Sequence, residues 1–217
     1  MDTEQPPALR PGITPPDRVL VGDLVLRRWQ PEDLAAKFAA VSASFEQLHH
    51  WMDWAAEPPD FDEMRAAHET VTTQWPTPDG GFNFGIFGRD GSLVGVVGLH
   101  DRVGPATLEV GYWCHVDHVG RGVITRAAGA LTTIALTLPG ITRIEIHCDV
   151  ANIRSAAVPR RLGYRLERIA PRPRKTPGDS GHGMCWVKES VIPPGHTGPD
   201  GITRGFVSGR PEQSPSR

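Results

Sequence analysis

Two glycines flank an arginine at Gly120-Arg121-Gly122, immediately before an apolar stretch with helical periodicity. The first turn of a helix offers backbone N–H groups without intrahelical partners and carries a partial positive charge. Glycines allow a ligand to approach those groups closely, so the loop predicts a site for an anion such as a pyrophosphate. Arg121 and Arg126 would add positive charge nearby. The alternative is a tight strand-to-helix turn that binds nothing.

Two common phosphate motifs fit this loop poorly. A P-loop requires Gly-Lys followed by Ser or Thr after a longer glycine run, and the chain has no such run. A dinucleotide-binding fingerprint requires three glycines in an early strand–helix–strand unit. This loop follows a hairpin in the middle of the chain and offers only two glycines. The loop therefore indicates an anion without identifying it.

Further residues that could bind a ligand or take part in catalysis lie before and after the loop in sequence. Asn152 stands three residues before Ser155 at the start of a predicted helix, where capping of the helix is the structural alternative to a ligand role. Glu109 and Tyr112 lie in a predicted strand before the loop. A carboxylate accepts protons and a phenol donates them, which are the two halves of acid–base catalysis. An ion pair at the end of the sheet is the alternative for Glu109.

Strands and helices alternate along the chain and would position these residues. Apolar patterns, turns and caps predict strands at 23–29, 82–88, 92–101, 107–116, 142–150, 164–170 and 183–189. They predict helices at 31–41, 45–52, 60–75, 123–138 and 152–163. This order predicts an α/β or α+β class with a mixed sheet. Pro159 falls inside the last helix, where it removes one backbone hydrogen bond and predicts a kink.

A single domain between two tails is predicted. Residues 1–17 are rich in proline, and residues 190–217 are rich in proline, glycine and serine, so both are predicted as tails. Residues 18–189 then form the one globular domain.

Composition and charge exclude several classes of protein. The formal net charge of −2 gives no sign of nucleic-acid binding, no apolar run is long enough to cross a membrane, and the first residues lack signal-peptide order. A cytoplasmic protein without nucleic-acid or membrane contacts is predicted. The three cysteines are widely spaced, which predicts buried, reduced thiols. Neither the cysteines nor the histidines show metal-ligand spacing, so the sequence predicts no metal site.

The motifs together resemble the GNAT acyltransferase family, and within it the RimJ/RimL-like branch. The matching stretches are EVGYW at 109–113, HVGRGVIT at 118–125, and Asn152, Ser155 and Leu162-Gly163-Tyr164 in order, and the resemblance covers residues 20–189. It implies a mixed, mostly antiparallel central sheet with helices on both faces and one splayed pair of strands. One departure is Asp117, an acid three residues before the first glycine, which is expected to point outward.

The resemblance also implies how a site would work. The pantetheine arm of an acyl-CoA would lie between the splayed strands, and its pyrophosphate would rest on the amides before the apolar helix. Glu109 would take a proton from the attacking amine, Ser155 would return one to the leaving thiol, and Tyr112 is the reserve donor. A backbone amide near Cys114 or Val116 would hold the oxyanion. The implied cofactor-binding residues are Cys114, Val116, Val119, Gly120, Arg121, Gly122, Asn152 and Ser155.

The resulting hypothesis is an acyl-CoA-dependent N-acyltransferase without a metal. Acetyl-CoA is the expected donor and succinyl-CoA the variant, and the acceptor would be a protein N-terminus or a small-molecule amine. An acidic block between Glu46 and Glu69 suits a cationic acceptor, and a basic block between Arg154 and Lys175 suits the 3′-phosphate of CoA, although solvated surfaces explain both. A homo-oligomer is also expected. The alternatives are a non-catalytic CoA-binding sensor or scaffold and an unrelated nucleotide-binding protein.

Overall fold

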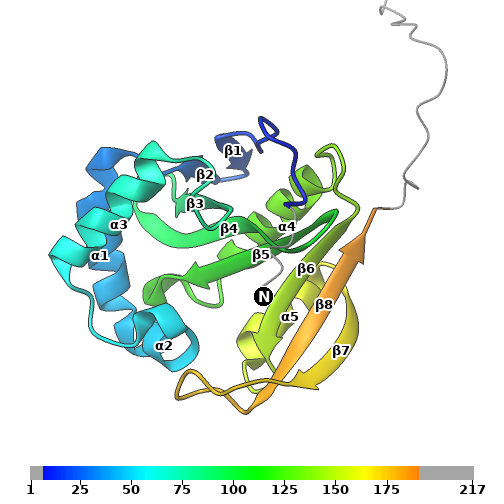
Figure 1. The fold of residues 1–217 in the computed structure, drawn as a ribbon. Helices are drawn as coiled ribbons and strands as arrows, with labels where there is room; N and C mark the ends of the chain where they lie inside the picture. Colours follow the sequence, from blue (N-terminus) through cyan, green and yellow to red (C-terminus); the bar gives the residue numbers. More distant parts are fainter. Residues whose placement is uncertain (1–6, 191–217) are drawn as a thin grey trace, which may run out of the picture.

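One eight-stranded sheet with helices on both faces forms the protein (Figure 1). The computed structural model describes residues 7–190 of the 217. The strands lie in the order β1-β2-β3-β4-β5-β6-β8-β7, and each neighbouring pair is antiparallel except β5 and β6. The predicted class, a mixed and mostly antiparallel sheet with helices on both faces, is confirmed. The predicted C-terminal tail lies outside the described residues, apart from its first residue.

The elements follow the predicted order closely. The strands are β1 (Arg18–Val21), β2 (Leu24–Arg28), β3 (Gly81–Phe87), β4 (Leu93–Gly104), β5 (Thr107–Cys114), β6 (Arg143–Asp149), β7 (Arg165–Pro171) and β8 (His182–Glu189). The helices are α1 (Leu34–Ala43), α2 (Phe45–Trp51), α3 (Phe61–Thr73), α4 (Val123–Ala135) and α5 (Ile153–Arg161), with short 3-10 turns at Pro31–Asp33, Asp53–Ala55 and Val116–His118. None of the helices within residues 7–190 has the length and apolarity needed to cross a membrane.

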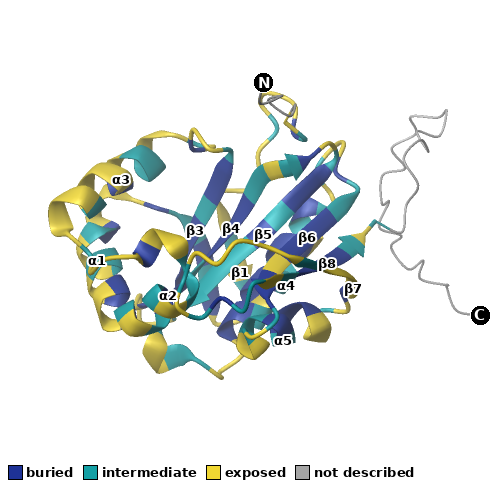
Figure 2. Ribbon diagram, turned by 60° about the horizontal axis from the view of Figure 1, so that its bottom comes forward, coloured by how far each residue is buried: buried dark blue, intermediate teal, exposed yellow. Residues whose placement is uncertain are grey.

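The two faces of the sheet carry different helices. α1, α2 and α3 cover one face of the sheet beside β2 to β5, and α4 and α5 lie on the other (Figures 1 and 2). Side chains alternate between the faces, so Leu108 and Val110 of β5 are buried in the core with Leu131 of α4. Trp113 of the same strand packs instead toward the first three helices. Residues of one strand therefore reach both layers.

The structure differs from the predicted strands at two places. β1 was not predicted, and it forms a hairpin with β2 through Gly22, whose φ of +64° is readily adopted by glycine. The strand predicted at 107–116 ends at Cys114. There His115 accepts a hydrogen bond from the Asp117 N–H on its Nδ1 at 3.2 Å and so begins a 3-10 turn.

β5 and β6 are paired over only three residues each. Thr107, Leu108 and Glu109 lie beside Arg143–Glu145 in parallel register. Beyond this point the two strands diverge, as Figure 1 shows. The predicted splayed pair is therefore present, and it lies between the last strand before the glycine loop and the strand that leads to α5.

Residues 7–17, predicted as part of a tail, pack against the sheet. The N–H groups of Ala8 and Leu9 donate hydrogen bonds to the two carboxylate oxygens of Asp101 at 2.7 and 2.9 Å. Leu9 is 7% exposed and belongs to the main core. Proline-rich composition did not reveal this attachment because the acceptor is distant in sequence.

The Asp101→Ala substitution should free this N-terminal segment. Loss of a charged acceptor that binds two amides costs about 1.5 kcal/mol or more, which corresponds to roughly tenfold faster exchange of those amides. Hydrogen–deuterium exchange with mass spectrometry on peptides covering residues 7–17 measures this. Asp90→Ala, which removes an exposed hairpin acid bonded to Ser92, is the matched control. Equal exchange in the two variants would contradict the role of Asp101.

Candidate active site

Two cavities meet where β5 and β6 diverge. The smaller, about 380 Å³, is lined by the glycine loop and the start of α4 and α5, and we name it the donor cavity. The larger, about 860 Å³, lies between the sheet and the segment from α1 to α3, and we name it the acceptor cavity. Tyr112, Asn152 and Ser155 line both cavities. Three predicted site residues therefore stand at the junction.

The glycine loop has the backbone geometry of an anion site. Gly120 and Gly122 have φ angles of +81° and +72°, in the left-handed region that favours glycine. A Cβ at either position would meet no atom within 4 Å, so the backbone is open rather than packed. Gly122 is the N-cap of α4, and no side chain caps this helix. The first amides of α4 are therefore available to a ligand.

Most of the predicted cofactor residues line the donor cavity. These are Cys114, Val119, Gly120, Gly122, Asn152 and Ser155. Arg154 and Arg161 of the predicted basic block also line it, so positive charge lies beside the anion site. The open amides of α4 and the two arginines suit an anionic ligand such as the pyrophosphate that the resemblance implies.

Three residues at the loop have neighbours that the sequence did not predict or lie outside the donor cavity. The Val116 N–H, predicted to serve the cofactor or the oxyanion, instead donates a hydrogen bond to Ser44 Oγ at 3.1 Å. Arg121 is exposed and does not line the donor cavity. Arg126 forms an ion pair with Asp23 on the β1–β2 hairpin. By contrast, the Asp117 side chain is 78% exposed and points outward as expected.

Tyr112 is held by a carbonyl that a proline leaves open. Its hydroxyl donates to the Ser155 main-chain oxygen at 3.0 Å, and Ser155 Oγ donates to the phenol oxygen at 3.3 Å. In a regular helix the Ser155 carbonyl would accept the N–H of residue 159. Pro159 has no N–H, so this carbonyl is available to Tyr112. The sequence predicted the missing bond but not the partner that replaces it.

Asn152 and the burial of Tyr112 complete this junction. Asn152 Oδ1 accepts the Ser155 N–H at 3.0 Å, which confirms the predicted cap of α5 and fixes the serine beside the tyrosine. Burial raises the pKa of Tyr112 well above its usual range, despite a hydrogen bond with Ser155 that opposes the change. Tyr112 therefore stays protonated near neutral pH. The junction therefore places two protonated hydroxyl groups side by side at the donor cavity.

Glu109 lines the acceptor cavity but is tied to an arginine. Arg102 Nε and Nη2 donate to its two oxygens at 2.9 and 3.1 Å. Burial alone would raise the pKa of Glu109, but the bonds from Arg102 outweigh it and hold the pKa below its usual range. Glu145 lies directly beside it on β6 and has its own arginine, Arg143. Glu109 is thus ionised and balances the charge of Arg102. For the same reason it is a weak proton acceptor.

His100 lies beside Glu109, and the sequence did not identify it. The two residues are cross-strand partners on β4 and β5, and both line the acceptor cavity. A Cβ at Gly98 or Gly111 would come within 3.1 and 3.0 Å of His100 Nε2, so these glycines make room for the imidazole. His100 Nδ1 is buried and has no hydrogen-bond partner among the residues that the structure describes. Burial lowers the pKa of His100, helped by the charge of Arg102, so the ring is a neutral base near neutral pH.

The acceptor cavity has acidic walls. Members of the predicted acidic block line it, namely Asp53, Glu57, Asp60 and Glu63. Lys37 also lines it, and burial lowers the pKa of this lysine to about 8. Part of the predicted acidic block therefore borders this cavity, and its charge suits a protonated amine.

The cysteines are free and mostly buried, as predicted. Cys148 and Cys185 are buried and Cys114 is partly buried, and all three are free thiols. Burial raises the pKa of each to about 11. The thiols are therefore protonated at neutral pH, because the thiolate forms only well above that range.

Comparison with known proteins agrees with this geometry. Residues 23–165 match the family model described as an acetyltransferase (GNAT) domain. YdaF of Bacillus subtilis (strain 168), whose name describes a ribosomal N-acetyltransferase, is 31% identical over 149 residues, covering 66% of this chain and 79% of the relative. A ribosomal-protein-serine acetyltransferase of Escherichia coli (strain K12) is 37% identical over 86 residues, which are 39% of this chain and 47% of the relative.

A solved structure shows the same fold. RimL, described as a ribosomal alpha-N-protein acetyltransferase in complex with coenzyme A, matches with a TM-score of 0.71 and 22% identity. The match covers 79% of this chain and 97% of that one.

Gly120→Val should abolish coenzyme A binding in a calorimetric titration, because the side chain occupies the open face of the loop and strains its left-handed backbone. Gly91→Val is the matched control. Gly91 has a φ of +80°, and a Cβ there also meets nothing within 4 Å, but it lies in the β3–β4 turn. Both variants should lose about 1–2 kcal/mol or more of stability. Retained affinity in Gly120→Val would remove the loop from the site.

Proposed function

This chain belongs to the GNAT acetyltransferase family, and we propose that it transfers the acetyl group of acetyl-CoA to the α-amine of a protein N-terminus. The observation that carries the proposal is the junction of two cavities at Tyr112, Asn152 and Ser155. One cavity has an anion site at a helix N-terminus, and the other has acidic walls. The names of the similar proteins support a ribosomal protein as the acceptor.

The residues of the chain divide the work of an acyl transfer. Bound acetyl-CoA supplies the activated acetyl group as a thioester. The acidic walls attract the acceptor as its ammonium form, and the amine must lose a proton before it attacks. We assign this proton to His100, directly or through water, in place of the predicted Glu109. Glu109, fixed by Arg102, would stabilise the charge that forms on the imidazole.

The leaving thiolate would take its proton from the hydroxyl pair. Ser155 and Tyr112 both line the donor cavity, and their hydroxyl oxygens lie 3.3 Å apart, so we assign the serine as the donor with the tyrosine beside it. A proton lost by the serine can be replaced from the neutral tyrosine, whose hydroxyl would turn from the Ser155 carbonyl to the serine oxygen 3.3 Å away. Asn152 Oδ1 keeps the serine in place by accepting the hydrogen bond from the Ser155 N–H.

Three finer points belong to the proposal. Acetyl is the proposed group because the similar proteins are named as acetyltransferases, and succinyl transfer remains to be compared by titration. A cytoplasmic location is proposed because a ribosomal acceptor would be met there. A homo-oligomer stays a prediction, for which exposed Trp54 and Phe61 offer apolar surface.

Mass spectrometry of acceptor peptides tests the reaction. The protein is incubated with acetyl-CoA and one of three kinds of acceptor. These are peptides that copy the N-termini of ribosomal proteins, the same peptides with a blocked α-amine, and small amines. We expect acetylation of free α-amines only. Acetylation confined to small amines, or to lysine side chains of blocked peptides, would contradict the proposed acceptor.

Ser155→Ala should lower kcat by roughly tenfold to ten-thousandfold, the range of one acid–base group. The affinity for acetyl-CoA should change little, because Asn152 still caps α5. Tyr112→Phe should lower kcat less, since the serine remains. Ser42→Ala, on the exposed face of α1, is the control. An equal loss of binding and turnover in Ser155→Ala would show that the serine only shapes the pocket.

The pH profile tests His100. The imidazole accepts a proton only in its neutral form, so kcat/KM should fall as the pH drops through its pKa. Because burial lowers that pKa, the acidic limb should lie below the ordinary histidine range. His100→Gln should lower the rate and remove this limb, whereas His182→Gln, at an exposed site on β8, should leave it. An unchanged limb in His100→Gln would assign the proton to another group.

A further inference from the structure

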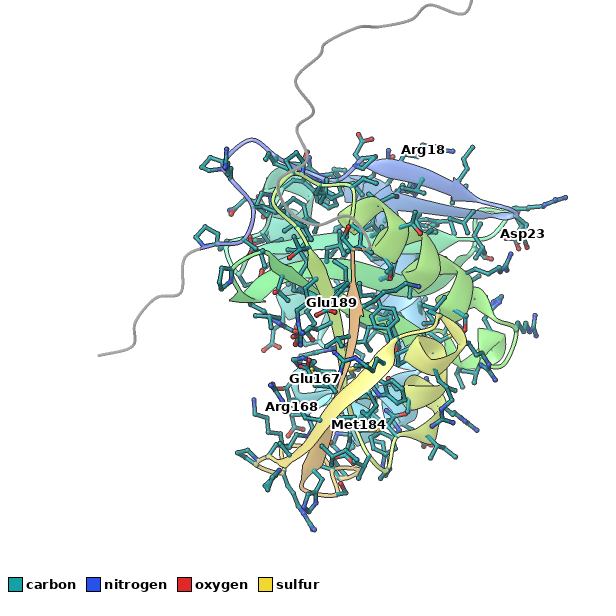
Figure 3. All side chains as sticks on the ribbon, turned by 90° about the vertical axis from the view of Figure 1, so that its right-hand side faces the viewer. Arg18, Asp23, Glu167, Arg168, Met184 and Glu189 are labelled. Carbon is teal, nitrogen blue, oxygen red and sulfur yellow. The ribbon has the colours of Figure 1, made fainter. Side chains whose placement is uncertain are left out.

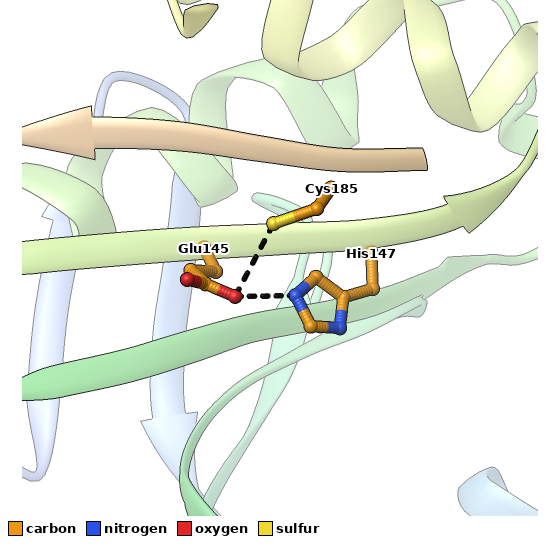
Figure 4. Close-up of side chains that lie close together, drawn as sticks. All are labelled: Glu145, His147 and Cys185. Atoms are coloured by element: carbon orange, nitrogen blue, oxygen red, sulfur yellow. Dashed lines mark hydrogen bonds and ion pairs between the residues drawn. The ribbon is translucent and has the colours of Figure 1, made fainter. Parts of the chain in front are cut away.

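Three side chains from two strands converge at the edge of the acceptor cavity. Glu145 and His147 are alternate residues of β6, and Cys185 of β8 is the cross-strand partner of His147, so all three project from the same face (Figure 4). Glu145 Oε2 lies 2.5 Å from His147 Nε2 and 3.4 Å from Cys185 Sγ. One ligand atom from each residue lies within 4.8 Å of the others.

We propose that Glu145, His147 and Cys185 form a binding site for a zinc ion. One carboxylate oxygen, one imidazole nitrogen and one thiolate sulfur are a borderline-soft donor set that suits zinc, whereas magnesium and calcium prefer oxygen ligands. Three protein ligands leave the fourth tetrahedral position to water or to a ligand from the cavity. The proposal does not depend on the acetyl-transfer reaction.

Two of the distances between the ligand atoms show that the side chains need to move little to bind zinc. Zinc bonds of about 2.0–2.3 Å place neighbouring ligand atoms of a tetrahedron about 3.3–3.8 Å apart. The 3.4 Å between Cys185 Sγ and Glu145 Oε2 already fits this spacing. The 2.5 Å between His147 Nε2 and the same oxygen must lengthen by about 1 Å, as the ion replaces a hydrogen bond. The His147 side chain is 37% exposed, so part of the imidazole borders solvent rather than packed side chains.

The surroundings orient the ligands and leave an entry path. Arg143 Nε donates to Glu145 Oε1 at 2.7 Å, so it holds the carboxylate by its other oxygen. Such outer contacts orient metal ligands in known sites. Glu145 and Cys185 are buried, while His147 lines the acceptor cavity. An ion would therefore enter from the cavity side and meet His147 first.

The positive charge of Arg143 is shared among several carboxylates and does not act on Glu145 alone. Arg143 also contacts Glu167 on β7 and Glu189 at the end of β8, so three carboxylates surround one guanidinium. Figure 3 shows where Glu167 of β7 and Glu189 of the neighbouring β8 lie. Binding of the ion would displace the thiol proton of Cys185 to solvent, and the resulting thiolate would offset part of the added charge.

Cobalt titration of the full-length protein tests the site. The protein, kept reduced and freed of metal with a chelator, is titrated with Co²⁺ and followed by absorbance. We expect one equivalent to produce a thiolate-to-cobalt charge-transfer band and the strong visible bands of tetrahedral cobalt, both removed by one equivalent of Zn²⁺. Cys185→Ser should lose the thiolate band. Cys114→Ser, which removes a different free thiol, should keep it.

His147→Gln should weaken Zn²⁺ binding by at least the roughly ten- to hundredfold that outer-contact changes cost. Thermal unfolding in the presence of chelator shows whether each variant is folded. If Cys185→Ser does not fold, His147→Gln tests the site instead, because His147 is exposed. No charge-transfer band in the unsubstituted protein would overturn the proposal and leave a hydrogen-bond network in which the imidazole and thiol donate to Glu145. A band that persists in Cys185→Ser would also overturn it.

Discussion

The brief pairing of β5 with β6 is the constraint on which the site depends. The two strands share three residues each and then separate beyond Glu109 and Glu145. Their facing backbone groups then need other partners, because buried amides and carbonyls are costly to leave unpaired. The gap connects the two cavities and brings the start of α5 beside β5. At the last shared pair, two carboxylates lie side by side, and this is tolerated because Arg102 and Arg143 each bind one of them.

In the proposed reaction, α5 would serve the structure and the chemistry through the same few atoms. Asn152 begins the helix by binding the Ser155 N–H, and the carbonyl of that serine holds Tyr112. The helix spares this carbonyl because Pro159 lacks the N–H that would otherwise use it. A residue that weakens a helix in isolation thus provides an acceptor at the junction of the cavities. Helix capping and proton donation are therefore compatible roles for one short segment.

Local signals made much of this predictable. The glycine pair, the Asn152 cap and the order of strands and helices each depend on neighbouring residues, so the family, the fold and the junction residues followed from sequence. Contacts between distant strands were not accessible. The Arg102–Glu109 pair and the space that Gly98 and Gly111 leave for His100 arise only from strand register. The end of β5 depends on the side chain of His115, which is why Val116 was assigned to the strand and to the cofactor. The Glu145–His147–Cys185 group likewise needs the pairing of β6 with β8.

The central claim is that the gap between β5 and β6 holds an acyl-CoA with its pyrophosphate on the first turn of α4. Calorimetric titration of the purified protein with acetyl-CoA, succinyl-CoA, free CoA and ATP, side by side, tests it most directly. The account predicts micromolar binding of the CoA species with acetyl-CoA preferred over succinyl-CoA, and no comparable binding of ATP. Absence of CoA binding, or equal binding of ATP, would mean that the glycine loop is only a turn or a general phosphate site, and would contradict the account.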